Sequence, residues 1–238
     1  MHNADCKGVS SLAFGSAIAM LLQKRSLGRT QGDRLKAIND FAHAWYSTRP
    51  GYHRLPPIRP SNLVNAQGWS DLCGSAIKAA NTRAYVPLLR DFCRLHFTAD
   101  TRTDRAVNAV LDSLVSYYET LYNGPMFLSA EAIRSLRATC ARMGYNWLIL
   151  REVGRDREKQ WWHVTPKCNK FHHTPDYCDI MNPRYLQAYS EESLVGTIVK
   201  IWKLFVSGRY ANSVQASVLM KRTLSMLLHY ETDVEYPS

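Results

Sequence analysis

Two apolar stripes with helical spacing, joined by a short turn, restrict the fold of this chain more than any other feature. They run through residues 104–122 and 129–151, where large apolar side chains recur every three or four positions. Asn123-Gly124-Pro125 separates the stripes, and Ser129 is a residue type that caps helix N-termini. The pattern predicts an antiparallel helical hairpin. The stripes consist of Val107, Val110, Leu111, Leu114, Val115, Tyr118 and Leu121, then Ile133, Leu136, Cys140, Met143, Trp147 and Leu150.

Further helices are predicted on both sides of the hairpin. Residues 11–22 are apolar but shorter than the ~20 residues that a membrane span needs, so we expect a helix that docks on the core. Residues 33–48 have helical spacing, as do residues 190–208 and 211–230. Between these regions, Ser70 or Asp71 is expected to cap a helix that Pro87 kinks or restarts.

Strand-like alternation is nearly absent, so the predicted fold class is all-α. We expect one irregular helical domain over residues 1–238, with six to eight helices. A long irregular segment is predicted at residues 151–189. The prolines crowded into residues 49–62 mark a weak sub-boundary.

The charge balance points toward acidic partners. Lys and Arg number 30 against 20 Asp and Glu, a formal net charge of +10. Nucleic acid, an anionic membrane surface and an acidic protein all fit such an excess. The basic residues are scattered, however, so a solvated surface is the alternative. Six widely spaced cysteines favour reduced thiols and an intracellular protein, nuclear or cytoplasmic, with no membrane association expected.

Residues 161–192 concentrate the side chains that are capable of chemistry. A zinc site would use Cys168, His172 or His173, and Cys178, with His163 or Asp176 as the fourth ligand. The two cysteines stand ten positions apart and no CxxC occurs, which is atypical of structural zinc sites. The alternative is a connecting loop whose aromatic and histidine side chains fill space between helices.

Carboxylates in the same segment suggest a second kind of site. Glu191 or Glu192 with Asp176 or Asp179 would suit acid–base chemistry or a magnesium ion. The two glutamates also lie where a helix N-terminus favours negative charge, which explains them without catalysis. No phosphate-binding glycine loop, GxSxG or HExxH motif occurs.

Several short motifs recur in a known arrangement: residues 77–83 with Val86-Pro87, Thr165-Pro166-Lys167, His173 with Pro175, residues 182–185, and residues 189–192 with Gly196. Through these motifs the chain, from about Phe14 to Leu228, resembles an uncharacterised multicopy family of unicellular algae. The copy number implies an origin in mobile elements, and the motif order is similar to the C-terminal part of cut-and-paste DNA transposases. The resemblance implies that Glu191 or Glu192 is the late metal-binding acid, and that the chain is the C-terminal part of a larger family domain. Asn169 stands where relatives tend to have a histidine, which puts any two-histidine site in doubt.

Three functions remain open from the sequence. The favoured hypothesis is a non-catalytic helical module that binds nucleic acid through Lys167, Lys170 and Arg184, which lie among aromatic residues. The second is a structural or protein–protein interaction module whose charges are solvated. The third is a degenerate transposase-like fragment with a metal-binding acid. No cofactor is required by the first two, whereas zinc or magnesium would belong to the third or to the cysteine–histidine cluster.

Overall fold

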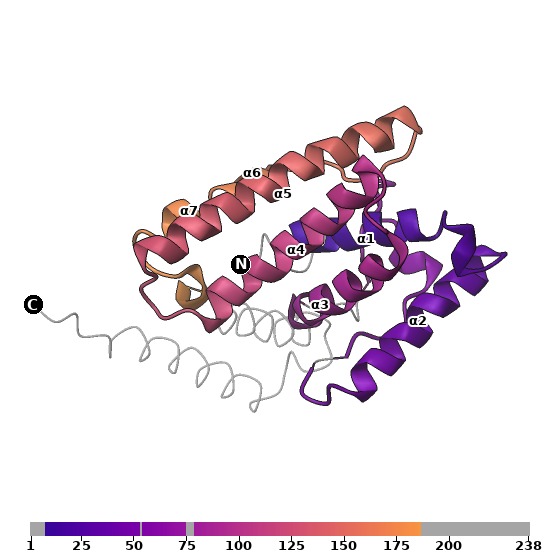
Figure 1. The fold of residues 1–238 in the computed structure, drawn as a ribbon, viewed down its shortest axis with the longest axis horizontal. Coiled ribbons are helices and arrows are strands. Elements are labelled where there is room, and N and C mark those ends of the chain that lie inside the picture. Colours follow the sequence, from indigo (N-terminus) through magenta and orange to yellow (C-terminus); the bar gives the residue numbers. More distant parts are fainter. Residues whose placement is uncertain (1–7, 53, 75–78, 187–238) are drawn as a thin grey trace, which may run out of the picture. The chain divides into compact units, whose positions relative to one another are not determined.

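A computed structural model describes residues 8–52, 54–74 and 79–186 of the chain. This part contains seven α-helices and three 3-10 helices and no β-strand, which confirms the all-α prediction (Figure 1). The chain separates into two compact units, Met1–Gln187 and Ala188–Ser238, and the described residues belong to the first. The helices predicted at 190–208 and 211–230 lie outside the described residues. Within the described ranges, no helix has the length and apolar character needed to cross a membrane.

The elements follow one another along the chain, with the longest connection between α2 and α3. The α-helices are α1 (Val9–Leu21), α2 (Gln31–Ser47), α3 (Ala79–His96), α4 (Arg102–Asn123), α5 (Ala130–Asp156), α6 (Pro166–His172) and α7 (Thr174–Tyr177). The 3-10 helices are η1 (Arg25–Leu27), η2 (Pro60–Asn62) and η3 (Pro183–Leu186).

The predicted hairpin is formed by α4 and α5, which lie side by side along their length (Figure 1). Both helices have a side-chain cap at the N-terminus. Thr101 Oγ1 accepts a hydrogen bond from Asp104 N at 3.0 Å, and Ser129 Oγ accepts one from Ala132 N at 3.2 Å. All thirteen residues of the two predicted stripes are buried. The hairpin was therefore predictable from its spacing and its caps together.

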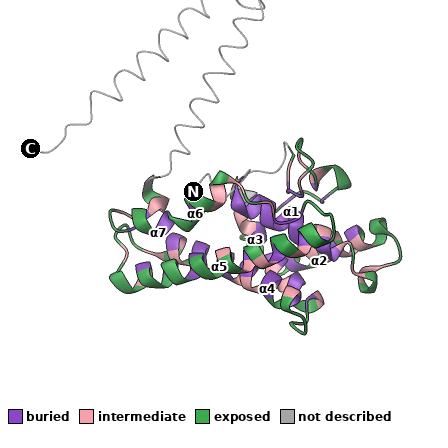
Figure 2. Cartoon of the chain, turned by 90° about the horizontal axis from the view of Figure 1, so that it is seen from above, coloured by how far each residue is buried: buried purple, intermediate pink, exposed green. Residues whose placement is uncertain are grey.

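Helix α1 is buried on every side, in contrast to the amphipathic hairpin. All of its residues except Ala19 are buried, because α3, α4 and α6 pack around it (Figure 2). Its polar side chains find partners: Ser10 Oγ lies 2.8 Å from Tyr118 Oη, and Ser16 Oγ accepts a hydrogen bond from Trp162 N at 2.8 Å. This confirms that residues 11–22 form a helix that docks on the core.

Gly15 lets another segment of chain pass close to α1. A Cβ atom at this position would lie 2.3 Å from the backbone nitrogen of Asp71. Just beyond, Leu72 N donates a hydrogen bond to Ser11 O at 2.9 Å. The segment around residues 70–73 is therefore fixed against α1 by its backbone.

That contact overturns the prediction that Ser70 or Asp71 caps a helix. Asp71 N donates to Leu63 O at 3.2 Å, and residues 70–74 are not helical. Helix α3 begins in the described chain at Ala79 and continues through Pro87 without a break, so the expected restart there is also wrong. Proline removes one backbone hydrogen bond. Burial of Tyr85, Val86, Leu88 and Leu89 around it keeps the helix intact.

Helix α2 covers the outer side of α3. A capping box begins it, because Thr30 Oγ1 accepts from Asp33 N while Asp33 accepts from Thr30 N. Phe41 packs against Phe92 with ring centroids 4.8 Å apart. Trp45 Nε1 donates to Asp91 Oδ2 at 3.0 Å.

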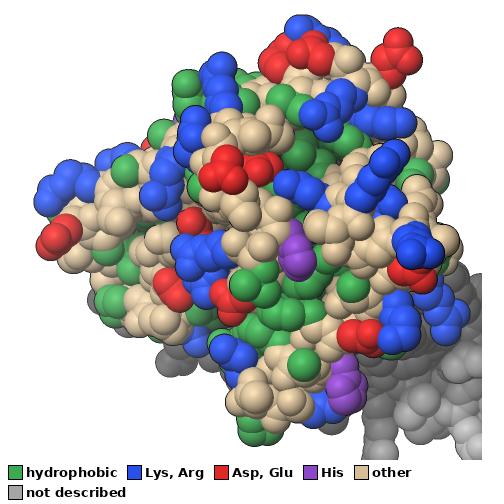
Figure 3. Space-filling view, turned by 45° about the vertical axis from the view of Figure 1, so that its right-hand side comes forward, with side chains coloured by type: hydrophobic (Ala, Val, Ile, Leu, Met, Phe, Trp, Pro, Cys, Tyr) green, Lys and Arg blue, Asp and Glu red, His purple; other side chains and the backbone are tan. Residues whose placement is uncertain are grey.

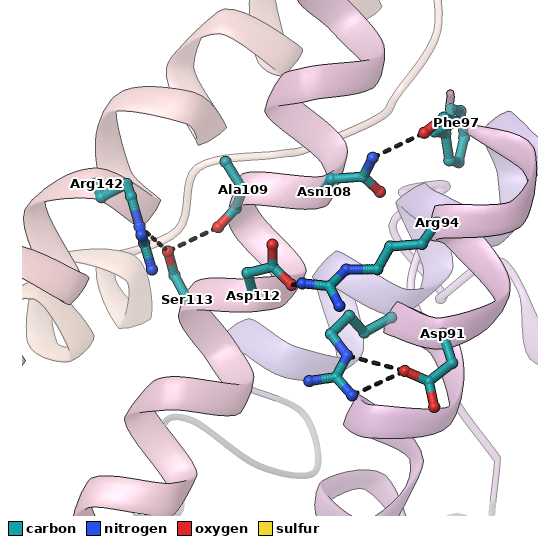
Figure 4. Close-up of polar contacts among 9 residues, drawn as sticks. Asp91, Arg94, Phe97, Asn108, Ala109, Asp112, Ser113 and Arg142 are labelled. Carbon is teal, nitrogen blue, oxygen red and sulfur yellow. Dashed lines mark hydrogen bonds and ion pairs between the residues drawn. The ribbon is translucent and has the colours of Figure 1, made fainter. Parts of the chain in front are cut away.

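A polar network joins α3, α4 and α5 at their surface (Figure 4). Arg94 of α3 pairs with Asp112 of α4 at 2.7 Å. Ser113, fully buried on α4, donates to Ala109 O at 2.7 Å and accepts from Arg142 Nε of α5 at 3.0 Å. These contacts tie the three helices together.

The long irregular segment predicted at 151–189 is shorter and more structured than expected. Helix α5 continues to Asp156, and the chain that follows passes close to the buried Gly154, where a Cβ atom would lie 3.2–3.3 Å from Trp161. Helices α6 and α7 and the 3-10 helix η3 occupy much of the remainder. Aromatic anchors account for this order: Trp161, Trp162 and Phe171 are all buried.

The described cysteines match the reduced thiols expected from the sequence. Cys73, Cys93, Cys140, Cys168 and Cys178 are free, and Cys93, Cys140 and Cys178 are buried. Burial raises the pKa of the Cys140 thiol to about 12 and that of Cys178 to about 11. These thiols are therefore protonated at neutral pH and serve as core side chains.

Candidate nucleic-acid interface

An open groove of about 680 Å³ lies between the 65–73 loop and the start of α6. It is lined by Leu12, Asn65, Ala66, Gln67, Trp69, Asp71, Cys73, Thr165, Pro166, Lys167 and Lys170. The volume falls within the ~300–1,000 Å³ typical of ligand sites. Two of the three residues predicted to bind nucleic acid, Lys167 and Lys170, thus share one concave surface.

The loop on one side of the groove is built around Asn65. Its Oδ1 accepts hydrogen bonds from Gln67 N and Trp69 N, both at 3.0 Å, and its backbone nitrogen donates to Trp69 O at 3.0 Å. Gly68 takes a positive φ of 81°, which a glycine adopts without strain. The turn holds Trp69 at the wall of the groove and leaves the Gln67 side chain exposed.

An aromatic stack flanks the groove. The rings of Trp69 and His163 lie 3.7 Å apart between centroids and 23° from parallel, and both are half-buried. Partial burial and the positive charge of Arg151 lower the pKa of His163 below its usual 6.5. The imidazole is therefore mainly neutral at pH 7, and the stack is a flat, uncharged aromatic surface with a guanidinium nearby.

His163 owes its position to the residue before it. Trp162 is fully buried, and its indole Nε1 donates to Met20 Sδ at 3.2 Å. Its carbonyl oxygen accepts from Trp147 Nε1 at 2.8 Å. Ser70 N also donates to Gln160 O at 3.0 Å, which fastens the 65–73 loop to the same segment. The two halves of the aromatic stack are thus held by one set of buried contacts.

The opposite wall of the groove is α6. Lys167 and Lys170 are three positions apart and so lie on the same side of this helix. Phe171, four positions after Lys167 on the same helix, is buried against Tyr117 with ring centroids 4.3 Å apart. Because Phe171 anchors the helix, the two lysines line the groove in a fixed register opposite Trp69.

An acidic group also lines the groove. Asp71 is 8% exposed, and its Oδ1 has no hydrogen-bond partner. Its Oδ2 accepts from Asn65 Nδ2 over a long 3.4 Å. The groove therefore combines two lysines, an aromatic face, exposed amides and one buried carboxylate.

Arg184, the third predicted nucleic-acid residue, does not join this groove. Its guanidinium lies 5.2 Å from the Tyr122 ring and donates to Tyr122 O at the end of α4. Arg83 stacks on the same ring at 4.0 Å. Both cations are engaged in holding the end of the hairpin.

The predicted zinc ligands are not brought together. Cys168 is half-buried beside Thr165, whereas Cys178 is buried and its Sγ donates to Thr174 O at 3.5 Å. His172 and His173 are exposed, with rings 5.3 Å apart. Among the residues that the structure describes, no group of three or more His, Cys, Asp or Glu side chains could hold a metal ion.

The acidic candidates are also accounted for, as far as they are described. Asp176 accepts from His173 Nδ1 at 2.9 Å and lies 3.8 Å from Arg137. Asp179 pairs with Arg137 at 2.7 Å. The two catalytic candidates, Glu191 and Glu192, lie outside the described residues.

Charge on the face of the molecule seen in Figure 3 is mixed. Lys and Arg side chains form several separate groups there, with Asp and Glu between them. This face carries no single broad basic field, which favours a local arrangement such as the groove as an anion site.

Trp69, His163 and Arg151 are site residues that the sequence did not single out for nucleic-acid binding. Asn65, two residues before Gln67 and three before Gly68, is a turn signal that could have placed Trp69 on a loop. Nothing local pairs Trp69 with His163, because they are distant in sequence. Comparisons of the chain with protein-family models, curated proteins and solved structures found no match.

Proposed function

We propose that this chain is a non-catalytic module that binds single-stranded nucleic acid in the groove between the 65–73 loop and α6. The observation that carries the proposal is the Trp69–His163 stack beside an open groove that Trp69, Lys167 and Lys170 line. Single strands are commonly bound by aromatic side chains that stack on bases and by cations that track the phosphates.

The shape of the groove favours a single strand over a duplex. The groove is concave, whereas reading a duplex requires an element that projects into a groove of the DNA. Helix α6 has seven residues and is anchored by Phe171, so it forms a wall of the site. Unstacked bases of a single strand can enter such a space, as in many RNA-binding proteins.

The polar groups fit the two ends of a nucleotide. Lys167 and Lys170 supply positive charge for a phosphate, and Arg151 adds a third cation beside the aromatic stack. The exposed Gln67 amide offers both a donor and an acceptor for a base edge. A site of this composition favours binding without catalysis and with little preference for base sequence.

A titration with a labelled oligonucleotide tests the proposal. We expect a fluorescein-labelled single strand to bind the full chain with an affinity that falls steeply with salt, by anisotropy. Lys167→Ala with Lys170→Ala should lower the slope of log K against log salt by about 1–1.5, since each phosphate contact on a single strand contributes ~0.7.

A charge-matched variant controls for the basic character of the whole protein. Lys36→Ala with Arg134→Ala removes two positive charges from exposed positions on α2 and α5, away from the groove. This variant should keep the wild-type slope. Equal losses in the two double variants would mean that net charge, and not the groove, binds the oligonucleotide, and would contradict the proposal.

A second candidate function rests on an apolar surface. Met126, Phe127, Tyr177, Ile180 and Tyr185 are exposed. Their segments are joined by a hydrogen bond from Asn182 N to Met126 O at 2.8 Å. Clustered exposed apolar side chains are typical of protein–protein interaction surfaces. This interaction function would use the end of the hairpin and would leave the groove free.

A further inference from the structure

A second, smaller cavity opens between α2, α3 and the 54–58 segment, and the nucleic-acid proposal does not use it. Its volume is about 200 Å³, and its apolar wall consists of Ala42, Leu55, Pro56, Pro57 and Ile58. For scale, an engineered cavity of about 150 Å³ in another protein binds benzene. This space therefore accommodates one six-membered ring with a small substituent.

Tyr85, one of the residues that line this cavity, has a buried hydroxyl without a partner. The residue is 1% exposed, and its Oη makes no hydrogen bond. Buried hydroxyls are nearly always hydrogen-bonded, because their desolvation is costly. The ring of Tyr85 is fixed edge-on to Phe14 at 5.8 Å, so the hydroxyl cannot easily turn away. A group that enters the cavity would supply the missing partner.

The wall of the cavity is built in advance of any ligand. Asn39 of α2 clamps Ile58 through both ends of its amide: Nδ2 donates to Ile58 O and Oδ1 accepts from Ile58 N, both at 2.9 Å. Leu55 N donates to Tyr46 Oη at 3.2 Å. These bonds fix the proline-rich segment to α2, so this wall of the cavity is formed without a ligand.

Charge around the cavity favours an anion. Tyr46, Arg54 and His43 line the cavity together with Tyr85. The positive charge of Arg54 acts on the Tyr46 hydroxyl, where it lowers the pKa against the larger effect of burial. A hydroxyl donor and a nearby guanidinium suit a carboxylate, and the apolar wall suits a flat ring.

The geometry points to a binding site for a small monocyclic aromatic carboxylate, with Tyr85 Oη donating a hydrogen bond to the carboxylate. The ring lies against Leu55, Pro56 and Ile58. This site is separate from the groove, so its occupancy does not depend on the proposed nucleic-acid function.

Fluorine NMR with 4-fluorobenzoate as the probe tests the site on the full chain. We expect saturable broadening of the probe resonance, and weaker broadening of fluorobenzene, which lacks the carboxylate. Tyr85→Phe keeps the ring and removes only the hydroxyl, so it should weaken the binding of 4-fluorobenzoate by about tenfold or more, the worth of one hydrogen bond to a charged group. Ala42→Leu fills the cavity and should abolish binding.

Tyr145→Phe is the matched control, because Tyr145 is 64% exposed on α5 and far from the cavity lining. It should bind the probe as the wild type does. Circular dichroism of each variant verifies that the helices are retained. Three results would overturn the inference: no saturable binding up to about 10 mM, equal affinity of Tyr85→Phe and wild type, or tighter binding of fluorobenzene than of 4-fluorobenzoate.

Discussion

The indole rings of Trp147 and Trp162 meet edge to face, with centroids 5.1 Å apart and planes at 86°. Trp147 Nε1 donates a hydrogen bond to the carbonyl oxygen of Trp162, so one pair of residues is joined both by its rings and through the backbone. The contact fastens the segment after α5 to the hairpin. Both Trp161 and His163 depend on it for their positions.

Replacement of Trp162 should be costly, because it removes a buried ring together with its edge-to-face contact with Trp147. Trp162→Ala removes a fully buried side chain and its bond to Met20, and we expect a loss of about 3–5 kcal/mol in the free energy of unfolding. Urea denaturation followed by circular dichroism measures it. Trp69→Ala, at a half-buried position, is the comparison and should cost clearly less. Similar losses would show that the Trp162 anchor has no special role.

Two glycines in helices should respond in opposite directions to alanine. Gly15→Ala places a Cβ 2.3 Å from the backbone of Asp71, which cannot move without breaking the Leu72–Ser11 bond, so we expect destabilisation by ~1–3 kcal/mol. Gly144→Ala has no heavy atom within 4 Å and should stabilise α5 by about 0.4–1 kcal/mol. Thermal unfolding of the two variants measures the difference. A stable Gly15→Ala protein would contradict the close approach of residue 71 to α1.

His163 should make oligonucleotide binding depend on pH. Burial and Arg151 depress its pKa, so the ring is neutral at pH 7 and becomes positive only as the pH falls below its usual 6.5. Protonation would add a cation beside the groove and raise the affinity for the oligonucleotide in that pH range. A bound phosphate would in turn favour protonation of the ring. His163→Gln should remove this acidic rise in affinity, measured by anisotropy from pH 7.5 to 5.0 in roughly constant salt.

The same shift has an opposite effect on stability. Because the folded protein disfavours the protonated ring, the contribution of His163 to stability is complete above the unfolded pKa and falls as the pH drops through the folded pKa. Tighter binding and lower stability should therefore appear together on acidification. An unchanged affinity between pH 7.5 and 5.0 would contradict the placement of His163 at the site.

The sequence predicted what depends on local spacing. The α4–α5 hairpin followed from its stripes, its turn and the Ser129 cap, all of which act between near neighbours. The prediction that Pro87 breaks the helix was wrong, because the burial of residues on both sides of it compensates for one lost backbone hydrogen bond. The prediction that Asp71 caps a helix was wrong. Its backbone position is set by the hydrogen bond to Leu63 O and by the close approach to Gly15.

The candidate site also combines features that local spacing predicts with features that depend on distant contacts. Lys167 and Lys170 were predicted from a basic, aromatic segment, and their shared side of α6 follows from a separation of three residues. Their pairing with Trp69 and His163 depends on two buried tethers, from Ser70 to Gln160 and from Trp162 to Ser16. Contacts between residues so far apart in the chain produce no periodic pattern in the sequence.

The all-round burial of α1 bears on how the protein is made. Ser16 meets its partner Trp162 across 146 positions of chain, and α4 and α6 also pack on α1. On the ribosome, α1 therefore emerges well before the helices that cover it. This apolar helix of 13 residues then lacks the helices that pack on it in the folded protein. Such long-range closure slows folding. Until those helices are synthesised, the apolar surface of α1 stays exposed in the nascent chain, where a chaperone would protect it from aggregation.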